Sequence, residues 1–106
     1  MDKKLLGRRI SLARKDKGLT SEKLSEICSI NATYLRQIEA GSRSPSLPMF
    51  ISICESLSVS PSYLLAGQFQ DRSMEDMDVL FELWKKATPK QIKMISSIIQ
   101  TALENT

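Results

Sequence analysis

The sequence predicts an all-α protein, with a five-helix domain over residues 1–67 and a two-helix C-terminal hairpin over residues 68–106. Two observations predict this fold. Apolar side chains recur at spacings of three and four residues, which places them on one face of a helix. Ser, Thr or Asn precedes most of these segments, where its side chain can accept a hydrogen bond from an unpaired N–H group of the first turn.

Residues 3–17 are expected to form the first helix. Leu6, Ile10 and Ala13 follow the helical spacing and are expected to face the core. Gly18 comes directly after this segment, in the position where a glycine commonly ends a helix. The first helix is therefore expected to have one buried face and one solvent face.

Residues 20–46 contain the pattern that is most informative about function, two short helices joined by a tight turn. Thr20 is a good N-cap for the first of them, and Leu24 and Ile27 form its apolar i, i+3 step. A three-residue turn follows, with Ile30 as its expected buried anchor. Two such helices joined by so short a turn have the geometry of a helix-turn-helix motif.

The second helix of this pair is expected to present polar side chains to the outside. Asn31 is its N-cap, Leu35 and Ile38 face inward at i, i+3 spacing, and Gly41 is placed to end it in the left-handed conformation. The side chains left on the outer face are those of Ala32, Thr33, Arg36 and Gln37. A polar helix held outward in this way is suited to the major groove of DNA.

Two further helices complete the N-terminal domain. The loop at 41–46 leads to a helix over about 47–57, with Ser46 as N-cap and Pro48 tolerated in the first turn. A Ser-Pro step at 60–61 starts a short fifth helix, because proline fits the first helical position.

The C-terminal hairpin is predicted from two capping boxes. After a polar linker at 67–72, Ser-Met-Glu-Asp at 73–76 resembles such a box and opens a helix that reaches about residue 87. Thr-Pro-Lys-Gln at 88–91 is a second box and opens a helix that reaches about residue 104.

The last helix of the hairpin has an apolar arc wider than one neighbouring helix can cover, because Met94 and Ile98 lie off its main apolar face. The first helix of the chain has a spare apolar pair as well, Leu5 and Leu12. Two explanations stay open: the hairpin folds back on the first helix as a larger core, or it forms a homodimer interface, which we favour. The expected interface residues are Met77, Leu80, Phe81, Trp84, Met94, Ile95, Ile98 and Ile99.

Several short motifs occur in the order found in one known family. They are Leu6-Gly7-Arg8-Arg9-Ile10, Arg14, Gly18-Leu19-Thr20, Leu24, Ile30, Tyr34-Leu35, Ile38-Glu39, Gly41, Pro45-Ser46, Leu57-Ser58-Val59-Ser60 and Leu64-Leu65. On these residues the chain resembles the lambda-repressor-like (XRE) helix-turn-helix transcriptional regulators, over about residues 5–67. The resemblance implies a five-helix DNA-binding domain and double-stranded DNA as the partner.

In that family the positions matching Ala32, Thr33, Arg36 and Gln37 commonly face bases. Gln37 can form two amide hydrogen bonds with adenine, and Thr33 can bond a base edge or pack on a thymine methyl group. Arg36 can reach a guanine or a phosphate, and Ala32 offers only a methyl contact. The alternative for each residue is an ordinary solvated helix face.

Other residues are better suited to the DNA backbone. Four polar residues are expected at phosphates, because they lie at helix N-termini or in the loop after the second helix of the helix-turn-helix, the recognition helix. They are Thr20, Ser21, Asn31 and Arg43. Tyr34 can bond a phosphate through its hydroxyl, or can simply pack half-buried.

The resemblance also implies a partly buried salt bridge between Arg14 and Glu39 that orients the recognition helix. Three serines depart from the family pattern: Ser21 replaces the usual Gln, Ser25 the common Ala, and Ser29 the usual Gly of the turn. Ser21 is shorter than Gln but can still donate to a phosphate. Ser29 would cost roughly 1 kcal/mol relative to Gly if the backbone there is left-handed.

The basic charge is concentrated in the N-terminal part of the chain. Residues 1–66 contain ten Lys and Arg against six Asp and Glu, a balance of +4, whereas residues 67–106 contain five against six, a balance of −1. Phosphate contact requires this kind of excess in the DNA-binding half, although a solvated basic face would have it too.

The composition argues against catalysis and against a metal site. The chain has no histidine, no glycine-rich phosphate loop and no carboxylates converging on one apolar pocket, so neither an enzyme nor a cofactor is expected. Cys28 and Cys54 lie among apolar neighbours and are expected to be buried and reduced, with a redox switch as the alternative. Two cysteines without histidine cannot form a standard zinc site.

No segment has the length of a transmembrane helix, and the N-terminus lacks the apolar core of a signal peptide, so a cytoplasmic protein is expected. The sequence therefore predicts a DNA-binding regulator, favoured as a repressor that acts as a homodimer. The alternative is a helical protein-interaction module, such as an antitoxin or an anti-repressor partner. The sequence identifies no small-molecule effector.

Overall fold

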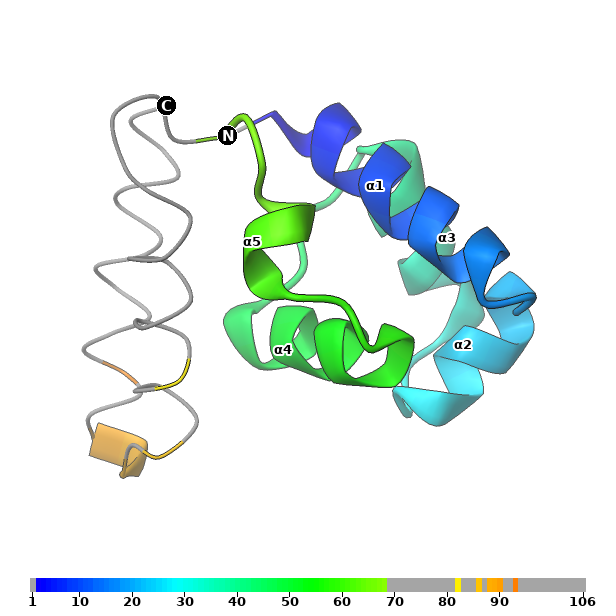
Figure 1. Cartoon of the computed structure of the whole chain (residues 1–106). Coiled ribbons are helices and arrows are strands. Elements are labelled where there is room, and N and C mark those ends of the chain that lie inside the picture. Colours follow the sequence, from blue (N-terminus) through cyan, green and yellow to red (C-terminus); the bar gives the residue numbers. More distant parts are fainter. Residues whose placement is uncertain (1, 69–81, 83–85, 87, 91–92, 94–106) are drawn as a thin grey trace. The chain divides into compact units, whose positions relative to one another are not determined.

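The structure is a computed structural model, and it describes residues 2–68, 82, 86, 88–90 and 93. Every regular element in these residues is a helix, which confirms the all-α fold (Figure 1). The chain divides into two compact units: the first is Asp2–Val59, and the second contains the residues from Ser60 onward. The helices are α1 (Lys3–Asp16), α2 (Ser21–Ile27), α3 (Ala32–Ala40) and α4 (Leu47–Leu57) in the first unit and α5 (Pro61–Leu64) in the second.

The helices begin where capping side chains were predicted. Thr20 Oγ1 accepts a hydrogen bond from the Lys23 N–H (3.1 Å), and Ser46 Oγ accepts one from the Met49 N–H (3.3 Å). Each bond satisfies a donor that has no partner within its own helix. Asp2 caps α1 in the same way, a role that the sequence patterns did not reveal.

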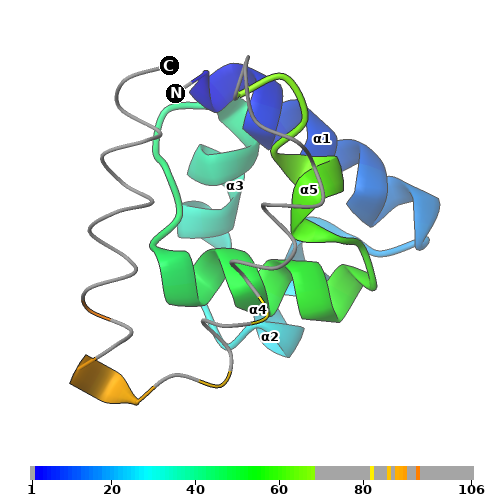
Figure 2. The same ribbon diagram turned by 60° about the vertical axis from the view of Figure 1, so that its left-hand side comes forward.

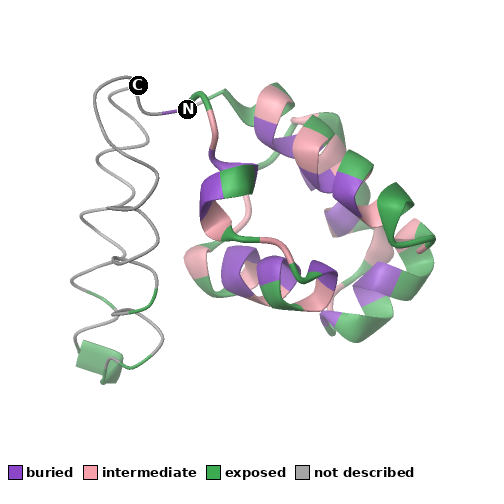
Figure 3. Cartoon of the chain, in the orientation of Figure 1, coloured by how far each residue is buried: buried purple, intermediate pink, exposed green. Residues whose placement is uncertain are grey.

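The core of the first unit lies between α1, α2, α3 and α4, and α1 makes its most extensive contacts with α3 (Figures 1 and 2). The inward-facing side chains predicted for α1 and α3 are buried, and Figure 3 shows the buried stripe along the helices. The buried apolar residues of this unit are Leu6, Ile10, Ala13, Leu24, Cys28, Leu35, Ile38, Phe50, Ile51, Ile53, Cys54 and Leu57.

Gly7 allows α1 and α3 to approach closely. A Cβ atom at this position would lie 2.4 Å from the Ile38 carbonyl oxygen and 2.5 Å from that of Glu39. Real Cβ atoms do not come so near to backbone atoms, so the helix crossing requires glycine here. The functional helix α3 therefore sits directly against the backbone of α1.

Two predicted core positions of the helix-turn-helix were wrong. Ile27 is 47% exposed, and the buried side chain near the end of α2 is that of Cys28. Ile27 and Cys28 lie on opposite sides of Leu24 around the helix, at i+3 and i+4, and the packing of α2 buries the i+4 side. Ile30, predicted as the buried anchor of the turn, is only half-buried.

Two serines adopt left-handed backbone conformations. Ser29, in the turn between α2 and α3, stands where the family usually has Gly and has φ 57°. Ser58, which caps the C-terminus of α4, has φ 54° and was not foreseen. Each serine costs roughly 1 kcal/mol relative to glycine in this region.

Cys28 and Cys54, the cysteines of the first unit, are buried and form no disulfide, as predicted. Cys28 Sγ lies 3.4 Å from Ser56 Oγ, so it has a polar partner on α4. Within the described ranges no three metal-binding side chains gather into a cluster.

The second unit is described through α5 and the residues after it. Ser60 caps α5 by accepting from the Tyr63 N–H (3.1 Å), with Pro61 in the first turn as predicted. Farther on, Glu82, Pro89, Lys90 and Lys93 are helical. Gln68, Lys86 and Thr88 of the predicted hairpin are described as well. Its other residues, which include all eight expected interface residues, lie outside the described residues, so the boundary at residue 67 and the interface stay predictions. No helix in the described part of the chain combines the length and apolarity needed to cross a bilayer.

Candidate nucleic-acid interface

The helix α3 is ordered by its own N-cap and by its buried face. Asn31 Oδ1 accepts hydrogen bonds from the N–H groups of Thr33 (2.7 Å) and Tyr34 (3.4 Å). Leu35 and Ile38 are 0% and 1% exposed, so the opposite side of the helix is fully packed. These contacts determine which side of α3 meets solvent.

A bidentate ion pair joins α3 to α1. Arg14 Nε donates to both carboxylate oxygens of Glu39 (2.9 and 3.1 Å), and Arg14 Nη2 donates to one of them (3.0 Å). Arg14 Nη1 also donates to the Leu19 carbonyl (2.7 Å), so the same guanidinium holds the linker between α1 and α2. The two side chains are only 12% and 10% exposed, so this is the partly buried pair that the family resemblance implied.

The four expected base-facing residues share the outer side of α3. Thr33 and Arg36 are exposed, whereas Ala32 and Gln37 are half-buried. Their positions, i, i+1, i+4 and i+5, form one face of a helix. The arrangement brings together an amide, a hydroxyl, a guanidinium and a methyl group, which are the groups that read base edges in the major groove.

Arg36 has a partner that the sequence patterns did not reveal. Its Nη2 pairs with Glu22 Oε1 on α2, and the side chains are 54% and 61% exposed. The Glu22 carboxyl has a lowered pKa, chiefly because it accepts from its own backbone N–H and then because of the Arg36 guanidinium. Glu22 is therefore ionised at neutral pH. An acidic residue in the first turn of a helix is already accounted for by the helix dipole. The sequence pattern therefore gave no reason to expect that Glu22 pairs with Arg36.

The residues expected at phosphates surround α3 and the start of α2. Thr20, Asn31 and Arg43 are exposed, and Ser21 is half-buried. Because the Asn31 Oδ1 atom is engaged in the N-cap, its amide nitrogen is the group left to donate to a phosphate.

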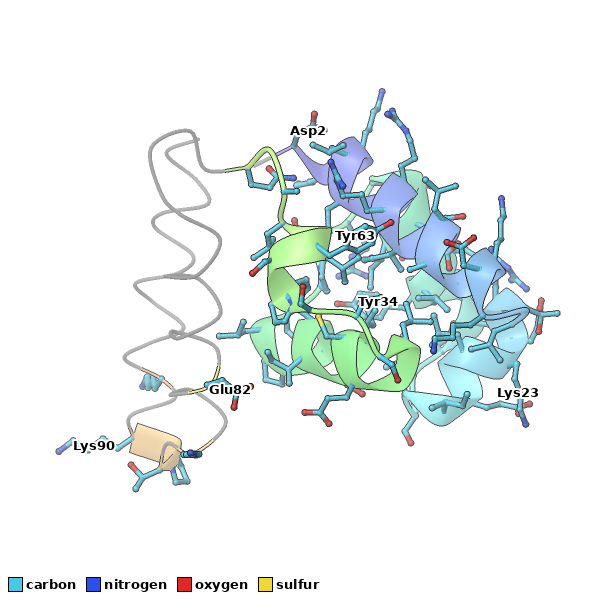
Figure 4. The ribbon with its side chains drawn as sticks, in the orientation of Figure 1. Asp2, Lys23, Tyr34, Tyr63, Glu82 and Lys90 are labelled. Atoms are coloured by element: carbon cyan, nitrogen blue, oxygen red, sulfur yellow. The ribbon has the colours of Figure 1, made fainter. Side chains whose placement is uncertain are left out.

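Tyr34 and Arg43 lie together at this surface. Tyr34, which is labelled in Figure 4, is half-buried. The Arg43 guanidinium carbon lies 5.2 Å from the centroid of the Tyr34 ring, a cation–π arrangement. The loop that carries Arg43 folds back on α3, because the N–H groups of Ser42 and Arg43 donate to the Gln37 carbonyl (3.0 and 3.3 Å). The Arg43 side chain is thus directed by α3 although it lies outside the helix.

Comparison with known proteins assigns this arrangement to a family. The family model described as a helix-turn-helix domain matches residues 7–68, more than half of the chain. The chain belongs to the lambda-repressor-like helix-turn-helix family. Members of this family of regulators bind DNA, and the protein is accordingly a DNA-binding transcriptional regulator. The family is not one of enzymes.

Individual relatives agree with the family assignment. The chain is 31% identical over 93 residues to the uncharacterized HTH-type transcriptional regulator YqaE of Bacillus subtilis, covering 86% of this chain and 80% of that protein. The fold of this helix-turn-helix protein is similar to that of the restriction-modification controller protein C.AhdI from Aeromonas hydrophila, with TM-score 0.57, 28% identity, and coverage of 59% of this chain and 96% of the other. It is also similar to the clp gene regulator ClgR from Corynebacterium glutamicum, with TM-score 0.60, 27% identity, and coverage of 80% and 88%.

Proposed function

We propose that this regulator is a cytoplasmic, sequence-specific repressor that binds a two-fold operator as a homodimer and places α3 in the major groove. The observation that carries the proposal is the polar outer face of α3, held outward by the buried Leu35 and Ile38 and by the Arg14–Glu39 pair. A dimer that occupies a promoter excludes other proteins from the same DNA, which is the reason for proposing repression.

The polar face also favours DNA over a protein partner. A helix that binds a protein commonly exposes aromatic or large apolar side chains at its centre. The exposed residues of α3 are Thr33, Arg36 and Ala40, and none of these three is aromatic or large and apolar. This composition supports base and phosphate contacts rather than an apolar interface.

A gel shift across salt concentrations tests the proposal. Selection of bound duplexes from a random-sequence pool supplies the operator, and an unrelated duplex of equal length supplies the reference. We expect a two-fold sequence with half-sites about 34 Å apart, and a steep loss of affinity as salt rises. Binding to no duplex, or binding that is insensitive to salt, would contradict the proposal.

Gln37→Ala is expected to weaken operator binding by about 1–3 kcal/mol and to relax the base preference at one position of each half-site. The physical reason is the loss of two amide hydrogen bonds to one base. Affinities for the operator and for single-base variants of it measure the effect. Equal weakening on every sequence would remove Gln37 from the base-reading residues.

Arg43→Ala is expected to weaken binding to all duplexes alike and to reduce the salt slope by about 0.9, since one phosphate contact is lost. Arg43→Lys is the matched control, because it keeps the positive charge at this position and should keep the salt slope close to that of the parent protein. A change in base preference with Arg43→Ala would contradict the assignment to a phosphate.

Removal of the chain after Gly67 is expected to leave a folded monomer that binds DNA weakly. A dimer doubles the phosphate contacts of a chain whose net charge is only +3, so loss of dimerisation lowers affinity. Sedimentation of the full chain and of the fragment measures the change. A fragment that still sediments as a dimer would show that residues 68–106 are not the dimerisation element.

A further inference from the structure

The ion pair between Glu22 and Arg36 joins the two helices of the helix-turn-helix on their exposed side. Arg36 lies on the outer face of α3, and Glu22 lies in the first turn of α2, so the pair spans the angle between the helices. A carboxylate this close to an expected DNA surface is unfavourable for binding phosphates, because it repels them. Its presence beside a base-facing arginine therefore needs a reason.

Stability does not supply that reason. Both side chains are more than half exposed, and exposed ion pairs contribute little to folding because water and salt screen them. The partly buried Arg14–Glu39 pair already fixes α3 on α1. The Glu22–Arg36 pair instead restricts where one flexible guanidinium can go.

The geometry of the pair leaves the arginine able to read a base. Glu22 engages Nη2, and in the described part of the chain the other guanidinium nitrogens make no hydrogen bond. A guanidinium has two edges that can donate two parallel hydrogen bonds, one formed by Nε and Nη2 and the other by Nη1 and Nη2. Because Nη2 carries one hydrogen for each edge, the bond to Glu22 occupies one edge and leaves the other free. A free edge is what bidentate bonding to guanine O6 and N7 requires.

We propose that Glu22 is a positioning residue for DNA specificity: it holds the Arg36 guanidinium over the major-groove face of α3 and keeps it from swinging to a phosphate. Guanine is then the partner that Arg36 selects, and the Glu22 charge lowers affinity for DNA that lacks this guanine. The inference rests on the proposed function, and it resolves the choice between guanine and phosphate for Arg36 in favour of guanine.

The test uses the full chain, the selected operator and an unrelated duplex of equal length. Glu22→Gln keeps the size and the hydrogen-bonding oxygen of the side chain but removes its charge. We expect the ratio of operator to unrelated affinity to fall roughly fivefold or more, the lower end of one bidentate base contact. This ratio should fall mainly because the variant binds the unrelated duplex more tightly. On that duplex the salt slope should be steeper by about 0.9, because Arg36 gains a phosphate contact.

Two further variants separate this role from a general effect of charge. Glu26→Gln removes a carboxylate from the same helix, one that pairs with Lys23 and is 71% exposed, and should leave the affinity ratio within about twofold of the parent protein. With Arg36→Ala in place, Glu22→Gln should have no larger effect than Glu26→Gln. Thermal unfolding should show that all variants stay folded.

The outcomes are distinct. If Glu22→Gln changes the ratio no more than Glu26→Gln does, or if its effect persists without Arg36, the positioning role is overturned while the DNA-binding function stands. If the parent protein binds no duplex, the proposed function fails first.

Discussion

Replacing Gly7 by alanine is expected to destabilise the protein by about 3 kcal/mol, the cost of forcing an extra methyl group into a packed site. The new Cβ would lie 2.4 Å from the Ile38 carbonyl oxygen, and backbone atoms cannot turn aside as a side chain can. The helices α1 and α3 must therefore separate, which loosens the core and displaces the expected DNA-binding face. Thermal unfolding should show a melting temperature lower by roughly 10 °C or more.

Gly18→Ala is the matched control for this substitution. Gly18 has φ +70° but no atom within 4 Å of an added Cβ, so only the left-handed conformation is penalised, by about 1 kcal/mol. Within a helix, alanine is more favourable than glycine by about 1 kcal/mol. This gain applies to Gly7→Ala, because Gly7 lies inside α1, and not to Gly18→Ala, because Gly18 follows the helix. A Gly7→Ala protein as stable as its parent would show that the helices do not cross so closely.

Replacing Arg14 by methionine is the second large expected effect, with a loss of about 3 kcal/mol in the free energy of unfolding. Methionine fills much of the same space but leaves the Glu39 carboxylate, which is 10% exposed, without its cation. The Leu19 carbonyl also loses a donor at 2.7 Å. Chemical denaturation of the parent and the variant measures the difference.

The double variant Arg14→Met with Glu39→Leu identifies the cause. Removing both charges is often nearly neutral, because no isolated charge stays buried. We expect the double variant to recover most of the lost stability, less the cost of the unpaired Leu19 carbonyl. Single and double variants that are equally unstable would show that methionine disrupts packing and that the charge pairing is unimportant.

Local signals were enough to predict the described helices. Thr20, Asn31 and Ser46 stand where the chain must satisfy unpaired N–H groups, so each marked the start of a helix within a residue. The error at Ile27 has a physical cause. An apolar step of three residues and one of four both fit a helix, and only the packing of α2 decides that Cys28 is buried in its place.

The candidate site was predicted less completely than the fold. The residues of α3 follow from its period, since burial of Leu35 and Ile38 directs Arg36 outward. The Glu22–Arg36 pair does not follow from any period, because the residues are 14 positions apart and meet only through the angle between α2 and α3. The left-handed conformation of Ser58 at the end of α4 was not predicted either, because glycine and not serine is the residue that usually marks such a helix end.

The N-cap of Asn31 and the pairing of Glu39 with Arg14 have a kinetic consequence for recognition. The helix α3 is ordered before any partner arrives, so encounter does not have to wait for a disordered segment to fold. The rate of association with DNA should then be governed by diffusion and electrostatic steering. The heat-capacity change of binding should correspond to the area buried at the interface, with no added contribution from folding of α3.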